Sequence, residues 1–177
     1  MPEKIKIIID TNVPVKAATP INDCPSGELG VQKKCMEFIN EFVISDRYCL
    51  VLDCRYEILR EYERNISKTS SMGIVFRRWL YTYIGQSVLS EDFVALNPNE
   101  VSTYDSFPLT EETKGFDISD RKFVALANAH PEKPPIIEGT DGKWIGYENA
   151  FSKYGIKICF LDREYAEKMY QKKCVKN

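Results

Sequence analysis

The segment Ile5-Lys6-Ile7-Ile8-Ile9-Asp10-Thr11-Asn12 decides the fold. Four of its first five residues are isoleucine, and such a continuous apolar, β-branched run is typical of a central parallel strand covered on both faces. An acid, Asp10, follows this run at once. Ligands of open parallel sheets gather beyond the carboxyl ends of the strands. The segment therefore predicts a buried central strand with a functional carboxylate at its end.

Outward from this segment, strand-like and helix-like stretches alternate along the chain. Apolar residues recur at helical spacing in several stretches, and short β-rich runs separate them. The expected strands are 5–9, 48–52, 93–96, a run after Pro134 that ends at Gly139-Thr140-Asp141, and 156–161, and the expected helices are 31–44, 55–67, 72–84, 120–130 and 147–154. This alternation predicts an α/β fold, a three-layer α/β/α sandwich with a central, mostly parallel sheet.

The length of 177 residues and the hydrophobic content of 44% suit one compact domain over residues 1–177. Residues 11–30 and 97–115 lack a clear periodic pattern. The first stretch is expected to be a loop, and the polar, turn-rich second one an ordered loop or a flexible flap. The Lys-rich end, residues 171–177, is expected to fray.

Several classes of protein are disfavoured by composition. Six cysteines occur without a C-x-x-C pair, so neither a zinc knuckle nor a disulfide framework is expected. The single histidine, His130, cannot build a histidine-centred metal site alone, and no G-x-S-x-G turn is present. No segment has the length of a membrane span, and the apolar run near the start is too short for a signal sequence. We therefore expect a cytoplasmic protein without a membrane partner.

The acidic residues are placed so that an α/β sheet would bring them together. Asp10 and Asp141 each follow a strand, Asp120 begins a helix, and Glu57 or Glu61 lies near the start of another helix. Crowded carboxylates raise one another's pKa unless a cation neutralises them. Ligation by carboxylates without histidine or thiolate favours hard ions, so Mg²⁺ or Mn²⁺ is the expected cofactor.

Net charge does not indicate a nucleic-acid binder, because 24 basic residues nearly balance 26 acidic ones, giving −2. Basic residues near the acids would instead line the approach of a polyanion. Those expected in this rim are Arg77, Arg78, Lys114, Arg121, Lys122 and Lys143, of which Arg121, Lys122 and Lys143 are the expected substrate-binding residues.

Four segments together resemble, in order, the acidic blocks of PIN-domain nucleases. The similarity extends from Ile5 to Leu161, and the segments are Ile7-Ile8-Ile9-Asp10-Thr11-Asn12, Ile58-Leu59-Arg60-Glu61-Tyr62, Asp120-Arg121-Lys122-Phe123-Val124-Ala125-Leu126-Ala127 and Thr140-Asp141-Gly142-Lys143-Trp144. Active members of that family are metal-dependent ribonucleases, either toxins paired with an antitoxin or RNA-processing enzymes.

The resemblance implies that Asp10, Glu61, Asp120 and Asp141 are catalytic and bind the metal. It also implies supporting residues: Thr11 or Asn12 would orient the first acid, and the hydroxyl of Thr140 would lie behind the ligands. This chain departs from the pattern in two places. Glu57 lies one turn from Glu61 and is the reserve candidate for the helix acid, and an extra acid, Asp117, precedes Asp120.

The expected function is metal-dependent hydrolysis of phosphodiester bonds in single-stranded RNA, as the toxin or effector of a toxin–antitoxin or defence system. The expected partners are single-stranded RNA, an antitoxin or regulatory protein, and a second copy of the chain in a homo-oligomer. The alternative is a catalytically silent PIN-like scaffold that binds RNA or protein.

Overall fold

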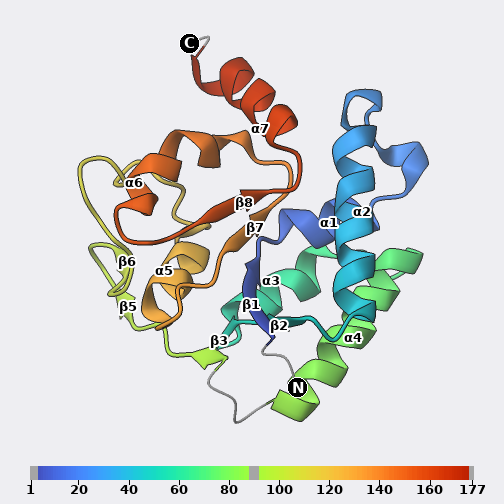
Figure 1. Cartoon of the computed structure of the whole chain (residues 1–177), viewed down its shortest axis with the longest axis horizontal. Helices are drawn as coiled ribbons and strands as arrows, with labels where there is room; N and C mark the ends of the chain where they lie inside the picture. The colour runs from blue at the N-terminus through green and yellow to red at the C-terminus, as the bar shows by residue number, and fades with distance from the viewer. Residues whose placement is uncertain (1–3, 88–91, 176–177) are drawn as a thin grey trace.

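Four parallel strands form the central sheet, which Figure 1 shows in the middle of the molecule. In sheet order they are Tyr48–Leu50 (β2), Ile5–Ile9 (β1), Ile136–Glu138 (β7) and Ile158–Phe160 (β8). The computed structural model describes residues 4–87 and 92–175. Within β1, which lies between two neighbouring strands, Ile7, Ile8 and Ile9 are buried and Ile5 is exposed. The expected α/β class with a parallel sheet is confirmed.

The expected strand 48–52 divides into two pieces. After β2 the chain passes Val51, whose N–H still donates to the Ile7 carbonyl at 2.9 Å. It then continues as Leu52–Asp53 (β3), which pairs in parallel with Phe93–Val94 (β4). The chain thus leaves the central sheet while its backbone groups remain hydrogen-bonded.

Residues 97–115 follow an ordered path, the first of the two expected alternatives. They include a short antiparallel pair, Pro98–Asn99 (β5) with Thr103–Tyr104 (β6). Tyr104 and Phe107 are buried, so the loop contributes aromatic side chains to the core.

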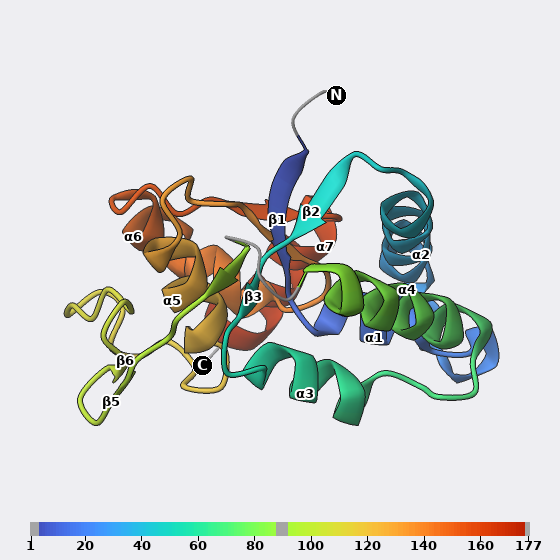
Figure 2. The ribbon, with the colours of Figure 1, turned by 90° about the horizontal axis from the view of Figure 1, so that it is seen from below.

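Helices flank the sheet, with α1, α2 and α4 on one side and α5 and α6 on the other in the two perpendicular views of Figures 1 and 2. The α-helices are Asn12–Ala18 (α1), Leu29–Ile44 (α2), Glu57–Asn65 (α3), Ser71–Ser87 (α4), Arg121–Ala129 (α5), Glu148–Ser152 (α6) and Arg163–Tyr170 (α7). Shorter helical turns are Ile21–Asp23 (η1), Ser26–Glu28 (η2), Gly142–Tyr147 (η3) and Gln171–Val175 (η4). Within the described ranges no helix is long and apolar enough to cross a membrane.

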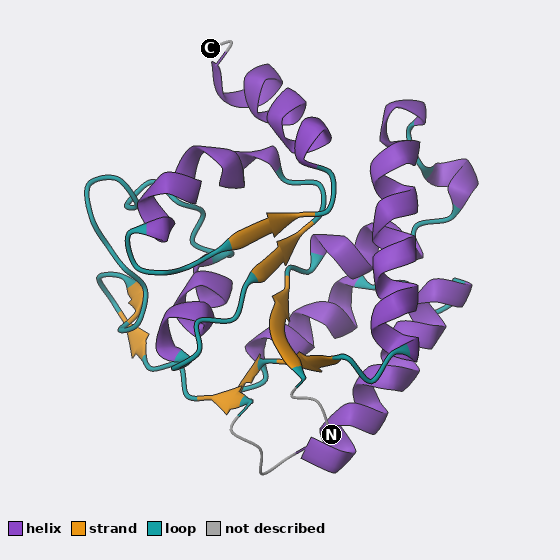
Figure 3. Cartoon of the chain, viewed as in Figure 1, coloured by secondary structure: helices purple, strands orange, loops and turns teal. Residues whose placement is uncertain are grey.

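Two expectations about local structure were wrong, and one helix was missed. Helix α1 occupies the start of the expected loop after β1, and its Pro14 is tolerated because the N–H groups of the first helical turn have no partner within the helix. Helix α7 was not predicted. Residues 171–175 of the expected frayed tail continue that helix as η4, whereas residues 176–177 lie outside the described part of the chain. The continuous helix is visible at the C-terminal end in Figure 3.

Aromatic side chains fill the space between α2 and α4. The ring of Trp79 lies 4.4 Å from that of Phe42 and stacks on Tyr83 at 4.9 Å, measured between centroids. Phe76 is buried beside them, and Trp144 is buried elsewhere in the core. These rings therefore belong to the core or pack against it.

Asp53 connects the end of β3 to the start of α3, and its removal is expected to destabilise the fold. Its carboxylate is buried and accepts hydrogen bonds from the N–H groups of Glu57 at 2.8 Å and Ile58 at 3.0 Å. Asp53→Ala leaves both donors without this acceptor, so we expect a loss of about 1–2 kcal/mol in the free energy of unfolding, measured by urea denaturation. Asp46→Ala, at an exposed acid, is the control. Equal effects of the two substitutions would contradict this role.

Candidate functional site

Two acids lie side by side where the central strands end. Asp10 follows β1, Glu138 is the last residue of β7, and the Asp10 N–H donates to the Ile137 carbonyl at 3.0 Å. Both side chains are buried, Glu138 completely. Burial, and then the neighbouring negative charges, raise the pKa of both carboxyls well above their ordinary values.

Asn12 ties these two strand ends together. Its N–H donates to Asp10 Oδ1 at 2.9 Å, and its side-chain amide donates to Glu138 Oε1 at 2.5 Å. Its Oδ1 accepts the N–H groups of Gly139 at 3.0 Å and Thr140 at 3.2 Å. A Cβ on Gly139 would come within 2.8 Å of that oxygen, so glycine is required for this close approach.

Two threonines were implied as supporting residues: Thr11, to orient the first acid, and Thr140, with its hydroxyl behind the ligands. Within the described residues, the buried Thr11 hydroxyl has no hydrogen-bond partner. Thr140 reaches the group through its backbone N–H, which binds Asn12. Asn12 is therefore the residue that orients the strand-end acids.

Asp120 joins the group at the start of α5. Its side chain makes no capping bond to the helix within the described structure. Burial is the main cause that raises the pKa of Asp120 to about 6, and the charges of Asp117 and Asp141 add to this while Lys122 opposes it. Asp120 is in turn the charge that most raises the pKa of Asp10.

Glu61 of α3 reaches the same group, and Lys122 neutralises it. The Lys122 ammonium pairs with the Glu61 carboxylate and donates to the Ser119 carbonyl. Its side chain is only 8% exposed. The positive charge of Lys122 also lowers the pKa of both Asp10 and Asp120. Lys122 is thus a cation built into the acidic group.

The reserve candidate Glu57 points elsewhere. Its carboxylate accepts a hydrogen bond from the Tyr104 hydroxyl at 2.5 Å and lies 3.8 Å from Arg55. Glu61, and not Glu57, is among the charges that raise the pKa of Asp10. Of the two alternatives that the sequence left open, Glu61 is the one placed with the other acids.

Asp141 completes the group on the β7 side. Its N–H donates to Glu138 Oε1 at 3.0 Å, and its Oδ1 accepts the N–H of Lys143 at 3.0 Å. The charge of Asp141 raises the pKa of Asp120 and of Glu138. All four acids implied by the resemblance therefore belong to one electrostatic group.

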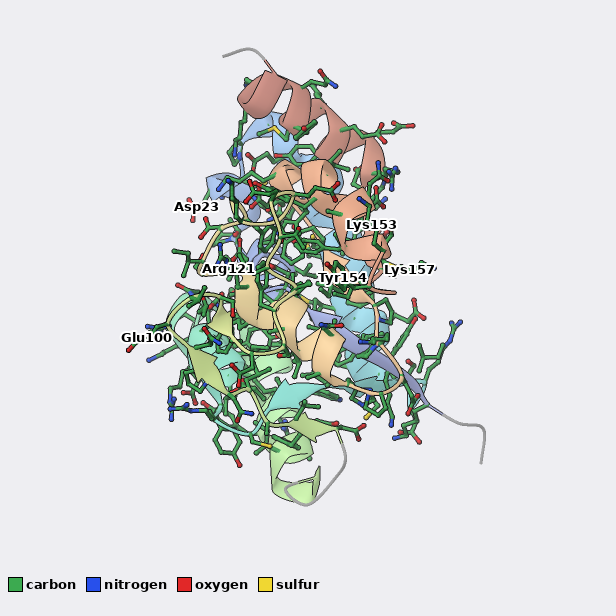
Figure 4. All side chains as sticks on the ribbon, turned by 90° about the vertical axis from the view of Figure 1, so that its left-hand side faces the viewer. Asp23, Glu100, Arg121, Lys153, Tyr154 and Lys157 are labelled. Carbon is green, nitrogen blue, oxygen red and sulfur yellow. The ribbon has the colours of Figure 1, made fainter. Side chains whose placement is uncertain are left out.

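Arg121 does not line an approach for substrate, which corrects the expectation from sequence. Its side chain is buried, and its guanidinium donates to the carbonyls of Phe116 at 3.3 Å, Ser102 at 3.4 Å and Lys114 at 2.7 Å. It also lies over the Phe107 ring at 4.6 Å. Arg121, labelled in Figure 4, fastens the 97–115 loop to α5.

Of the other expected polar residues, Asp117 and Lys143 lie beside Asp120 and Asp141 of the group. Asp117 and Lys143 are both partly exposed, with Lys143 Nζ 3.6 Å from Asp117 Oδ2. Lys114 pairs with Glu111, and Arg77 donates to the Glu63 carbonyl. Among the residues expected to bind substrate, Lys143 is the one that remains open to solvent.

Glu138 was missed by the sequence analysis. Its signal was an acid at the end of the apolar run Pro134-Pro135-Ile136-Ile137, next to the turn that begins at Gly139. The expected strand ran on to Asp141, which placed Glu138 inside it. The observed strand ends at Glu138, so this acid lies at the same edge as Asp10.

The donor set suits a hard divalent cation, because it consists of carboxylates alone. One oxygen of the buried Glu138, Oε2, has no hydrogen-bond partner in the described structure, which leaves it available to a ligand. As the side chains of residues 4–87 and 92–175 now lie, no three Asp, Glu, His or Cys groups meet closely enough to hold one ion. A metal ion at Glu61 would have to compete with the Lys122 ammonium that already pairs with this carboxylate.

The raised pKa of Asp120 predicts a pH-dependent stability. An unfolded Asp titrates near pH 4, so between about pH 4 and the folded pKa of about 6 the folded state binds more protons and stability falls as pH rises. Asp120→Asn removes this loss. We expect its free energy of unfolding at pH 8 to exceed that of the wild type by about 1–2 kcal/mol, discounted for partial exposure.

The measurement is urea denaturation in EDTA at pH 4, 6 and 8. Asp46→Asn, at an exposed acid, is the matched control and should follow the wild-type profile. An Asp120→Asn profile parallel to that of the wild type would show that Asp120 does not experience the crowding described above.

Comparisons with protein-family models, with curated proteins and with solved structures find no match for this chain. The relation to PIN domains therefore remains an expectation from the sequence blocks.

Proposed function

We propose that this chain is a Mg²⁺- or Mn²⁺-dependent ribonuclease of the PIN type that hydrolyses phosphodiester bonds in single-stranded RNA. One observation carries the proposal: Asp10 after β1, Glu61 in α3, Asp120 before α5, and Glu138 and Asp141 at the end of β7 come from four segments and gather at the carboxyl edge of the parallel sheet. Gathering like charges costs free energy unless a cation compensates them. The helices on both sides of the sheet also suit the three-layer sandwich of that family.

In this proposal Asp10, Asp120, Asp141 and Glu61 hold the metal, and Glu138 supports them. When bound, the metal supplies a more acidic water and stabilises charge on the leaving oxygen. Asn12 keeps Asp10 and Glu138 in place through its four hydrogen bonds. Because the acids are recessed, a phosphate must project to reach them, which favours flexible single strands over duplexes.

A hollow of about 680 Å³ opens beside α3, with Glu61 of the acidic group in its wall. Its charged residues are the cations Lys122, Arg60 and Arg64 and, besides Glu61, the acids Glu57 and Glu63. The two arginines are exposed and lie four residues apart on α3, where they present two positive charges to phosphates. They replace Arg121 as the proposed phosphate-binding residues.

The biological role proposed with this activity is that of a toxin or effector in a toxin–antitoxin or defence system. An antitoxin or regulatory protein would restrain it by covering the acidic edge. Growth arrest on expression that depends on Asp10 is the corresponding cellular test.

A catalytically silent scaffold is the second candidate, and the Lys122–Glu61 ion pair favours it. The ammonium already supplies the positive charge that the acids require. The two candidates differ in whether a divalent ion can replace this internal cation.

The first test is cleavage of labelled single-stranded RNA. We expect cleavage with Mn²⁺, none with EDTA, and loss of cleavage in Asp10→Asn, because the neutral amide is a weaker ligand for a hard cation. Asp46→Asn, at a surface acid, should retain wild-type activity. Cleavage that survives in Asp10→Asn or in EDTA would refute metal-dependent catalysis at this site.

The second test removes the internal cation. Lys122→Met leaves Glu61 unpaired, so we expect lower thermal stability in EDTA and a larger increase in Tm on addition of Mn²⁺ than in the wild type, since a ligand that binds only the folded state stabilises it. Differential scanning fluorimetry measures both. If Mn²⁺ leaves Tm unchanged in both proteins, the scaffold interpretation stands and the metal site fails.

A further inference from the structure

A separate pocket of about 500 Å³ opens beside the acids, on the side of η3 and α7. Asp120 and Asp141 belong both to this pocket and to the acidic group, so whatever the pocket holds lies next to the proposed reaction. Its other polar residues are Asp117 and Lys143, and its aromatic residues include Tyr147 and Tyr170. It therefore combines aromatic surface with three carboxylates, those of Asp117, Asp120 and Asp141, and one ammonium, that of Lys143.

The two tyrosines offer rings held in place by their neighbours. Tyr147 packs edge-to-face against the buried Phe116, with centroids 5.0 Å apart. The ring of Tyr170 lies against the backbone of Gly146, where an added Cβ would come within 2.9 Å of it. Both tyrosines are partly exposed. Aromatic rings presented in this way bind nucleobases by stacking.

The polar wall presents an acceptor next to a donor. Asp117 Oδ1 accepts the N–H and the hydroxyl of Ser119 at 3.0 and 2.9 Å, and these bonds hold the pKa of Asp117 below its ordinary value. The ionised carboxylate only accepts hydrogen bonds. The Lys143 ammonium, a donor only, lies 3.6 Å from Asp117 Oδ2.

Guanine matches this pair better than the other RNA bases do. Its Watson–Crick edge carries two adjacent donors, N1–H and N2–H, which suit a carboxylate, followed by O6, which suits a lysine. Adenine, cytosine and uracil each offer a single donor position on that edge, beside an acceptor that an ionised carboxylate repels.

We propose that this pocket binds a guanine base, stacked on Tyr170 and Tyr147 and recognised by Asp117 and Lys143. The part of this proposal that places the guanine next to a cleaved phosphate rests on the proposed ribonuclease function. The binding of guanine itself does not depend on that function. In RNA, the pocket would favour cleavage next to a guanosine.

The test is titration of the full chain with GMP, AMP, CMP and UMP in EDTA, followed by intrinsic fluorescence and by NMR. We expect GMP to bind about tenfold more tightly than the other three. Asp117→Asn should remove this preference, because the amide offers a donor where guanine needs an acceptor. Tyr170→Ala should weaken binding of GMP about tenfold through loss of stacking.

Tyr154→Ala is the matched control, since Tyr154, labelled in Figure 4, is exposed, follows α6 and is not part of the pocket lining. It should bind GMP as the wild type does. Circular dichroism establishes that each variant is folded, and Asp117→Asn, at a partly exposed position, tests the pocket even if Tyr170→Ala does not fold.

The outcomes separate this proposal from the ribonuclease. Equal binding of the four nucleotides, or GMP binding unchanged in both pocket variants, overturns the guanine site. Mn²⁺-dependent RNA cleavage without GMP binding or guanosine preference overturns the pocket and leaves the ribonuclease. GMP binding without cleavage supports the pocket and removes the ribonuclease.

Discussion

The placement of Asp10 and Glu138 next to each other, buried at the ends of β1 and β7, is the constraint around which the structure is arranged. Burial and the negative charges of neighbouring acids make ionisation unfavourable for both carboxyls and raise their pKa values. Asn12 donates hydrogen bonds to both acids and accepts one from the loop after β7, and these bonds offset part of the cost. The Tyr62 hydroxyl donates to the Ile9 carbonyl at 2.5 Å, which joins α3 to the same strand end. The buried isoleucines of β1 fix the position of the strand end at which these groups lie.

Two adjacent basic residues on α5 serve different parts of the molecule. Arg121 points into the 97–115 loop and binds three backbone carbonyls. Lys122 points toward α3 and pairs with Glu61. Successive residues on a helix face directions about 100° apart, so neighbours in sequence reach different surroundings. The loop and the acidic edge are therefore both anchored at the first turn of α5, and Asp120 stands immediately before it.

Predictions of strands and helices from the local sequence pattern were correct where the burial of apolar surface alone dictated the structure. The isoleucine run of β1 could bury its apolar surface only inside a sheet. The apolar stripes of α2, α3, α4 and α5 could be buried only by packing one side of each helix against the rest of the protein. Helix α1 escaped prediction because it begins directly after the strand and carries Pro14 in its first turn. Helix α7 is short, and its packing against η3 rather than a long apolar stripe accounts for its formation.

Periodicity and the order of the acids along the chain were enough to indicate a parallel α/β sheet with Asp10, Asp120 and Asp141 at its carboxyl edge. Only the tertiary structure showed that Glu61 rather than Glu57 lies with the other acids and that Glu138 lies there too. It also showed that Arg121 binds the 97–115 loop and that Lys122 lies among the acids. The reason is physical: a side chain's charge and hydrogen bonds depend on which distant residues surround it, and neither spacing nor composition specifies those neighbours.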